Sequence, residues 1–175
     1  MKMTSEQKKL AKAKALEEAR VTEERRVKKY MRAAIKQALV AQKNGEVPIG
    51  AVIVMDGKII ARAHNERETK RLATAHAEIL AINKACKKVG DWRLNGAELF
   101  VTLEPCAMCA GAIANARVSR VYYGAPEKKG GACGSVHSVL PHSGLNSKTE
   151  VFGGIEEEKC LSLIKNFFED KRKKV

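Results

Sequence analysis

The feature that most constrains how this chain of 175 residues can fold is a set of three metal-binding side chains from two separate segments. His76 stands two residues before Glu78, and Cys106 and Cys109 form a Cys-x-x-Cys some thirty residues later. Imidazole nitrogen and thiolate sulfur are ligands that zinc prefers, and three protein ligands leave its fourth position open, as in catalytic sites. The sequence therefore predicts that both segments meet at one zinc ion, with the Glu78 carboxylate beside it and free for proton transfer.

The residues around His76 predict that this ligand lies at the start of a helix. Thr74 is a favourable N-cap for a helix from about Ala75 to Lys88, which Gly90 ends. Residues two apart on a regular helix point in nearly opposite directions. For His76 and Glu78 both to face the metal, His76 must therefore lie in the irregular first turn.

The two cysteines are predicted to begin a second helix, from Cys106 to about Ala116, which Pro105 opens. Cys106 and Cys109 are three residues apart on its first turn, so both thiols can face the same point. The positive end of the helix dipole favours their thiolates. A structural zinc site usually has a fourth protein ligand, and neither a second Cys-x-x-Cys nor a His pair is evident in the sequence. The pattern thus favours a catalytic site.

Strands and helices alternate along the chain after an initial hairpin. Asp56-Gly57 predicts the hairpin turn between strands at 50–55 and 58–64. Hydrophobic periodicity and caps predict further strands at 98–103, 118–123 and 149–152, and helices at 23–43, capped by Thr22, and at 156–171. This order predicts an α/β fold of three layers, α/β/α, in which a mixed central sheet carries helices on both faces. A Gly-, Ser- and Pro-rich stretch at 124–147 is expected to be a functional loop.

The first 22 residues differ from the rest of the chain in composition, because most of them are Lys, Glu, Ala or Arg. Thr4 and Gln7 match a capping box, which would start a solvated helix. So little apolar surface could not hold this segment to a core. We expect residues 1–22 to be a charged extension, either mobile or a solvated helix, and residues 23–175 to form a single domain.

The chain is strongly basic, with a formal net charge of +13 from 33 Lys and Arg against 20 Asp and Glu. Residues 1–29 hold ten Lys or Arg and five Asp or Glu, so they supply +5 and the rest of the chain supplies +8. This charge is typical of proteins that bind nucleic acid, although a merely soluble basic surface is an alternative.

The sequence also bears on the compartment. No apolar run approaches the roughly 20 residues of a membrane helix, and the amino terminus lacks the apolar core of a signal peptide. Outside the Cys-x-x-Cys, Cys86, Cys133 and Cys160 are scattered and odd in number, which is a poor framework for disulfides and indicates a reducing compartment. We therefore expect a cytoplasmic protein without a membrane segment.

Further segments match the pattern of one enzyme family. His-x-Glu with Pro-Cys-x-x-Cys is itself the pattern of zinc deaminases that act on nucleobases. The other matching segments are Gly45–Ala51, His64–Arg67, Thr74–Glu78, Val101–Cys106, Gly130–Ser135 and Phe167-Phe168. With them, the chain closely resembles the tRNA-specific adenosine deaminases of bacteria, which have the cytidine deaminase-like fold. The resemblance runs from about Tyr30 to Phe168.

The resemblance implies zinc-dependent, hydrolytic deamination of adenosine to inosine at the wobble position of a tRNA anticodon. It implies a homodimer with one zinc ion per subunit, held by His76, Cys106 and Cys109, and it implies Glu78 as the catalytic residue. The tRNA anticodon stem-loop would be the partner, and residues 23–175 would be a single zinc deaminase domain.

Five further positions match substrate-binding positions of the family. Ile49 would pack on the face of the flipped base, and the Asn65 amide would hydrogen-bond the base. Glu127 would contact the nucleotide beside the target, while Arg67 and Phe168 would meet the anticodon loop. An extruded base needs an apolar face and an amide that reads its edge, and basic side chains suit phosphate contacts.

Two other functions stay open at this point. Deaminases of free bases or nucleosides, such as guanine or cytosine, share the zinc pattern and need no basic surface. A non-catalytic zinc-fold RNA-binding module would not need Glu78. The chain also departs from the family at Ala73, where Pro is common, and at Glu127, where Asp is common, so the Glu127 contact would shift by a methylene.

Overall fold

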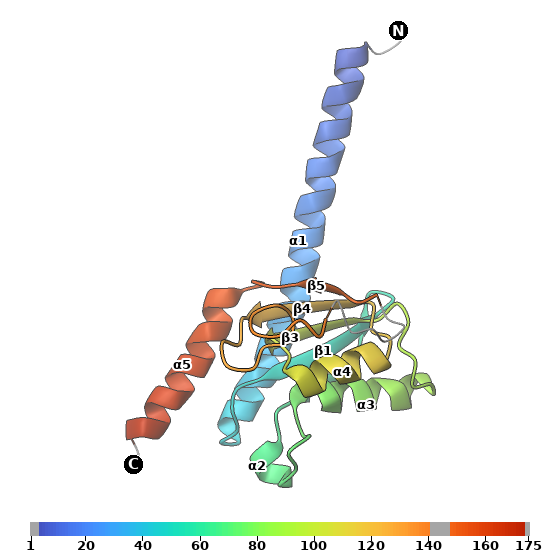
Figure 1. Ribbon diagram of the computed structural model, residues 1–175. Coiled ribbons are helices and arrows are strands. Elements are labelled where there is room, and N and C mark those ends of the chain that lie inside the picture. Colours follow the sequence, from blue (N-terminus) through green and yellow to red (C-terminus); the bar gives the residue numbers. More distant parts are fainter. Residues whose placement is uncertain (1–3, 141–147, 174–175) are drawn as a thin grey trace.

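Figure 1 shows the computed structural model of the protein, which describes residues 4–140 and 148–173. Part of the loop expected at 124–147 therefore lies outside the described residues. None of the described helices is both long and apolar enough to cross a membrane. The elements are, in order, α1 (Ser5–Lys43), β1 (Gly50–Met55), β2 (Lys58–His64), α2 (Arg67–Lys70), α3 (Ala77–Val89), β3 (Glu98–Leu103), α4 (Ala107–Asn115), β4 (Arg120–Ala125), β5 (Glu150–Phe152) and α5 (Glu157–Lys173).

The strands form one mixed sheet in the order β2-β1-β3-β4-β5. β1 runs antiparallel to both β2 and β3, whereas β3, β4 and β5 are parallel to one another. Parallel neighbours need a crossover connection, which α4 supplies between β3 and β4. The carboxyl ends of β3 and β4 consequently lie at one edge of the sheet, beside the amino end of β1.

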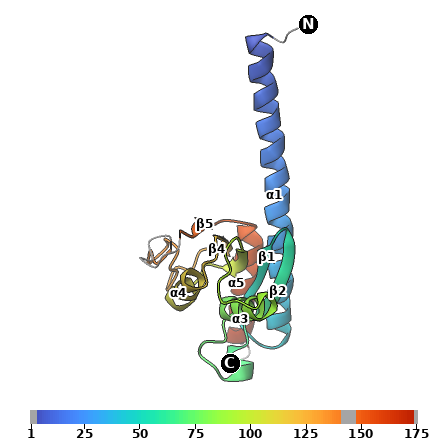
Figure 2. The ribbon, with the colours of Figure 1, turned by 90° about the vertical axis from the view of Figure 1, so that its right-hand side faces the viewer.

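Helices cover both faces of this sheet, which confirms the predicted three-layer α/β/α fold (Figures 1 and 2). The helices α3 and α4 pack on one face, where Ala81 and Ile113 join Leu99 in the core. The helix α1 covers the other face, and Met31 packs there with Phe100. Leu99 and Phe100 are neighbours in β3 and serve opposite faces, because successive side chains of a strand alternate.

The start of β1 is fixed against α1 by a glycine. A Cβ atom at Gly50 would collide with the backbone of α1 at Ala34 and Ala38, so only glycine allows this approach. On the other side, the Gly50 N–H donates to Thr102 Oγ1 of β3 at 3.1 Å. The segment just before Gly50 is therefore held between a helix and the neighbouring strand.

The helix α1 is continuous over 39 residues, so the predicted helix start at Thr22 is wrong. The capping box of Thr4 with Gln7 is confirmed, and Thr22 lies inside the helix, where its hydroxyl donates to a carbonyl one turn earlier. The first buried residue of α1 is Val27, and the preceding turns project from the body (Figure 1). Ion pairs three and four residues apart support this solvated part of the helix.

The remaining predicted elements agree with the structure to within two residues at each end. β4 begins at Arg120 rather than at 118, and α3 begins at Ala77, with His76 and not Thr74 as its N-cap. The short helix α2 was not predicted, because four residues are too few to show a hydrophobic period.

Candidate active site

A cavity of about 210 Å³ opens where β3 and β4 end and β1 begins. It is lined by Val47, Ile49, Asn65, Arg67, His76, Glu78, Leu103, Glu104, Cys106, Glu127, Ile164 and Phe168. The structure thus brings together the residues singled out from the sequence, with Cys109 fully buried beside the cavity. Val47, Leu103, Glu104 and Ile164 are lining residues that the sequence analysis did not assign.

Three donor atoms converge in the geometry that a zinc ion requires. His76 Nδ1 lies 3.8 Å from Cys106 Sγ and 3.6 Å from Cys109 Sγ, and all three donors lie within 4.8 Å of one another. Tetrahedral zinc with bonds of about 2.3 Å to sulfur and about 2.0 Å to nitrogen places such ligands about 3.6 to 3.8 Å apart. The residues present therefore fit the ion.

Helix caps produce this convergence. His76 is the N-cap of α3 with extended backbone (φ −75°, ψ 150°), so it lies outside the regular helix, as the sequence predicts. Cys106 is likewise the N-cap of α4 (φ −73°, ψ 173°), and Cys109 follows one turn later. Pro105 therefore precedes the helix rather than occupying its first turn. Each ligand-bearing segment points the positive end of a helix at the site.

The three donors share protons when no metal holds them. Hydrogen bonds from Cys109 and His76 lower the pKa of Cys106 to about 3, so this sulfur is a thiolate. The same hydrogen bond and burial raise the pKa of Cys109, and the hydrogen bond to Cys106 raises the pKa of His76. A divalent cation can displace these protons, which is how zinc binds Cys and His ligands.

Glu78 is the catalytic candidate beside the donors. Its side chain is buried, and Oε2 is the one buried side-chain oxygen without a hydrogen-bond partner among the described residues. Burial raises the pKa of Glu78 to about 7. A carboxyl group with such a pKa, in a cavity beside a metal site, can both take up and release a proton near neutral pH.

Two buried glutamates hold segments of the cavity wall by hydrogen bonds, and the first of them is Glu46. Asn65 Nδ2 donates to Glu46 Oε2 at 3.1 Å, and the backbone N–H groups of Glu68 and Thr69 donate to the same carboxylate at 3.2 and 2.7 Å. Burial alone would raise the pKa of Glu46, but the hydrogen bonds from Thr69 and Glu68 outweigh it and lower this pKa. Glu46 is thus an ionised anchor for Asn65 and α2.

The second buried glutamate, Glu104, anchors the opposite wall. Its carboxylate accepts the backbone N–H groups of Glu127, Cys133 and Ser135 at 3.0, 2.9 and 3.1 Å. Burial alone would raise the pKa of Glu104, but a hydrogen bond from the Ser135 side chain, followed by these backbone hydrogen bonds, lowers it. Gly131 packs so closely on this carboxylate that a Cβ would collide with it.

The mouth of the cavity is basic and partly apolar. Phe167 is buried and Phe168 is 45% exposed, so the adjacent rings divide between core and surface. Phe168 also lines an adjoining open hollow of about 680 Å³ together with Lys129, Lys171 and Arg172. Ile164 and Phe168 are four residues apart on α5, a helical spacing that could have identified Ile164 from the sequence.

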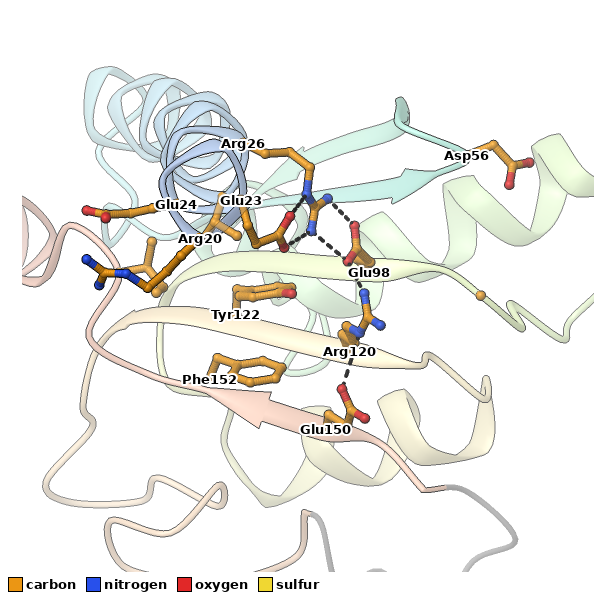
Figure 3. Close-up of a pocket in the computed structure, with 13 residues that line it drawn as sticks. Arg20, Glu23, Glu24, Arg26, Asp56, Glu98, Arg120, Tyr122, Glu150 and Phe152 are labelled. Carbon is orange, nitrogen blue, oxygen red and sulfur yellow. Dashed lines mark hydrogen bonds and ion pairs between the residues drawn. The ribbon is translucent and has the colours of Figure 1, made fainter. Parts of the chain in front are cut away.

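A larger hollow of about 970 Å³ lies elsewhere, between α1 and the face of β3, β4 and β5 (Figure 3). Arg26 pairs there with Glu98, and Arg120 joins Glu98 to Glu150. The Tyr122 ring stacks on an aromatic neighbour in β5. Its lining contains neither His nor Cys, and its five acidic residues outnumber its three arginines. The smaller cavity, which is lined by His76 and Cys106, is therefore the candidate active site.

Comparisons with known proteins agree with this site. The family model of the MafB19-like deaminases matches residues 26–172. A tRNA-specific adenosine deaminase of Bacillus subtilis is 52% identical over 83% of this chain and 90% of its own length. One of Agrobacterium fabrum is 44% identical over 82% of this chain and 94% of its own.

Solved structures agree as well. A structure from a study of A-to-I editing by tRNA:A34 deaminases superposes with a TM-score of 0.72, at 44% identity over 77% of this chain and 97% of that one. A guanine deaminase of Bacillus subtilis superposes with a TM-score of 0.55, over 56% of this chain and 63% of that one. A deaminase model that matches most of the chain, and relatives this similar over nearly their whole length, identify the chain as a member of the tRNA-specific adenosine deaminase family.

Proposed function

We propose that this protein is a zinc-dependent enzyme that deaminates adenosine to inosine at the wobble position of a tRNA anticodon. Family membership supports the reaction and the substrate. The observation that carries the proposal is the unpaired, buried oxygen of Glu78, in the same small cavity as His76 and Cys106. A structural zinc site needs no such carboxylate, whereas a hydrolytic deaminase does.

The residues His76, Cys106 and Cys109 would hold the zinc ion, whose chemistry is to lower the pKa of a water so that hydroxide is available near neutral pH. Glu78 takes the proton of the attacking water and delivers it to N1 of adenine while oxygen adds to C6. Glu78 then carries the proton of the new hydroxyl group to the amino group. The C6–N bond breaks, ammonia leaves and inosine remains.

The shape of the cavity supports a single extruded base as the substrate. Its volume of about 210 Å³ is smaller than the roughly 300 Å³ at which pockets for drug-sized ligands begin. Ile49, Val47 and Leu103 give it apolar walls, and Asn65, which also lines it, would hydrogen-bond the base. An enzyme with so small a cavity must take its base out of the stack.

Contacts outside the cavity would hold the RNA. Arg67, Glu127 and Phe168 lie at its mouth, and the basic side chains of the adjoining hollow would contact phosphates of the anticodon loop. The net charge of +13 supports such a partner. We also propose that the chain forms a homodimer, acts in the cytoplasm, and holds its zinc site within residues 23–175. Light scattering of the purified protein tests the dimer.

The experiment that tests the function is incubation of the zinc-loaded protein with an anticodon stem-loop that carries a wobble adenosine, followed by an inosine assay. Free adenosine, cytidine and guanine are assayed in parallel, because the similarity to a guanine deaminase makes a free base the second candidate substrate. Inosine in the RNA is expected. Conversion of a free base with no conversion of the RNA would refute the proposal.

A further inference from the structure

We propose that Glu46 is a positioning residue for base recognition: it fixes which end of the Asn65 amide faces the substrate. This inference rests on the function proposed above, in which Asn65 reads the flipped base. Glu46 does not touch the substrate in this scheme and acts through Asn65.

The contact between the two side chains is buried. Glu46 is fully buried and Asn65 is 3% exposed, and they are joined by a hydrogen bond of 3.1 Å from Asn65 Nδ2 to Glu46 Oε2. An ionised carboxylate can only accept hydrogen bonds. The amino end of Asn65 must therefore point to Glu46, since the carbonyl end would place two acceptors in contact at a buried site.

This direction leaves a defined pattern for the substrate. One N–H of the Asn65 amide is used by Glu46, and the second N–H and the carbonyl oxygen remain. The Asn65 carbonyl oxygen has no hydrogen bond to any other described residue, and the side chain lines the cavity. Asparagine recognises adenine through one donor and one acceptor. An amide that is already held in the right orientation loses no conformational entropy when the base binds.

The anchor itself is firmly held. The Glu46 N–H donates to the Ala41 carbonyl at 3.0 Å, which ties the residue to the last turn of α1. The Glu46 carboxylate also accepts the backbone N–H groups of Glu68 and Thr69 in α2, whose first residue, Arg67, lines the cavity. One carboxylate therefore sets both the base-reading amide and the helix that brings Arg67 to the mouth.

A double-mutant cycle distinguishes orientation of Asn65 from simple anchoring of the loop. The variants are Glu46→Gln, which keeps the volume but presents either a donor or an acceptor, Asn65→Ala, and both together. We expect Glu46→Gln to lower kcat/KM on the stem-loop about tenfold, and to have less than about a twofold effect in the Asn65→Ala background. The same factor in both backgrounds would overturn the proposal.

A matched control is Glu104→Gln, which alters the other buried anchor without touching Asn65. Its factor on kcat/KM is expected to be the same in the unaltered background and in the Asn65→Ala background. An equal coupling of Glu104 and Glu46 to Asn65 would show general loosening of the cavity and would overturn the proposal.

A second readout does not depend on turnover. In a ¹⁵N–¹H spectrum the side-chain NH₂ signals of Asn65 are identified by their loss in Asn65→Ala. A proton donated to a buried carboxylate is shifted downfield and exchanges slowly, and both properties should be lost in Glu46→Gln. Unchanged signals would overturn the positioning role. A zinc-loaded, unaltered protein that makes no inosine would instead refute the proposed function. The spectra would still show whether Glu46 orients the Asn65 amide.

Discussion

Replacing Glu104 with glutamine should loosen one wall of the active site and destabilise the whole protein. In the native structure Oε1 accepts the N–H groups of Cys133 and Ser135, and Oε2 accepts that of Glu127. Glutamine has one oxygen and one NH₂ group, so at least one of these N–H groups must face a second donor. The best orientation keeps the two bonds to the oxygen and loses the bond to Glu127.

The magnitude follows from these bonds. A hydrogen bond to a charged group contributes about 1.5 to 3 kcal/mol, and each of the two remaining bonds weakens when its acceptor becomes neutral. The expected loss is about 2 to 5 kcal/mol of unfolding free energy, or roughly 4 to 20 °C in Tm for a protein of this size. Urea unfolding of the zinc-saturated protein measures the loss.

The location of the effect is tested by hydrogen exchange. The amide protons of Glu127, Cys133 and Ser135 should exchange faster in Glu104→Gln, while those in α1 change little. Glu158→Gln, an exposed glutamate in the first turn of α5, is the control and should change stability by less than about 0.5 kcal/mol. If Glu104→Gln behaves like this control, the carboxylate does not hold the loop and the reasoning is wrong.

Four further outcomes are expected. Glu78→Gln should lower kcat by about 10² to 10⁴ while metal analysis still finds zinc, because proton transfer and not metal binding is removed. Cys109→Ser should instead lose zinc, as measured on the dialysed protein. The pKa of Glu46 is lowered in the fold, so the stability that its carboxylate contributes is present above the ordinary pKa of 4.5 and is lost as pH falls through the lower folded value. Below about pH 4.5, the unfolding free energy of Glu46→Gln should therefore depend less on pH than that of the unaltered protein. Removal of residues 1–22 should leave zinc content and inosine formation unchanged, because Val27 is the first buried residue.

Local signals in the sequence were sufficient to predict the layers of the fold and the candidate zinc ligands. The alternation of strands and helices predicted the mixed sheet, and the two-residue spacing of His76 and Glu78 required an irregular helix start, which the structure confirms. Such features depend on residues close together in the chain, where spacing and geometry are directly linked.

The errors and omissions have a common physical origin in interactions that sequence spacing does not reveal. Thr22 has a residue type that favours N-caps, but good helix formers and ion pairs on either side continue the helix through it. Glu46 and Glu104 look like ordinary charges in the sequence. Their partners lie between 19 and 31 residues away, and only the folded chain shows that these carboxylates are buried and hydrogen-bonded.

The unbroken helix α1 also gives the molecule a long, rigid projection. Its 39 residues extend about 58 Å, and the part before Arg20, where the helix first reaches the hollow beside the sheet, extends about 22 Å from the body. A solvated helix is a stiff rod, and this one ends at the turn that carries Glu46. The rod and the wall of the cavity that holds Asn65 are thus one continuous segment, joined by the hydrogen bond from the Glu46 N–H to the Ala41 carbonyl. A fluorophore near Ser5 would report the slow tumbling of an elongated particle rather than the fast motion of a free tail.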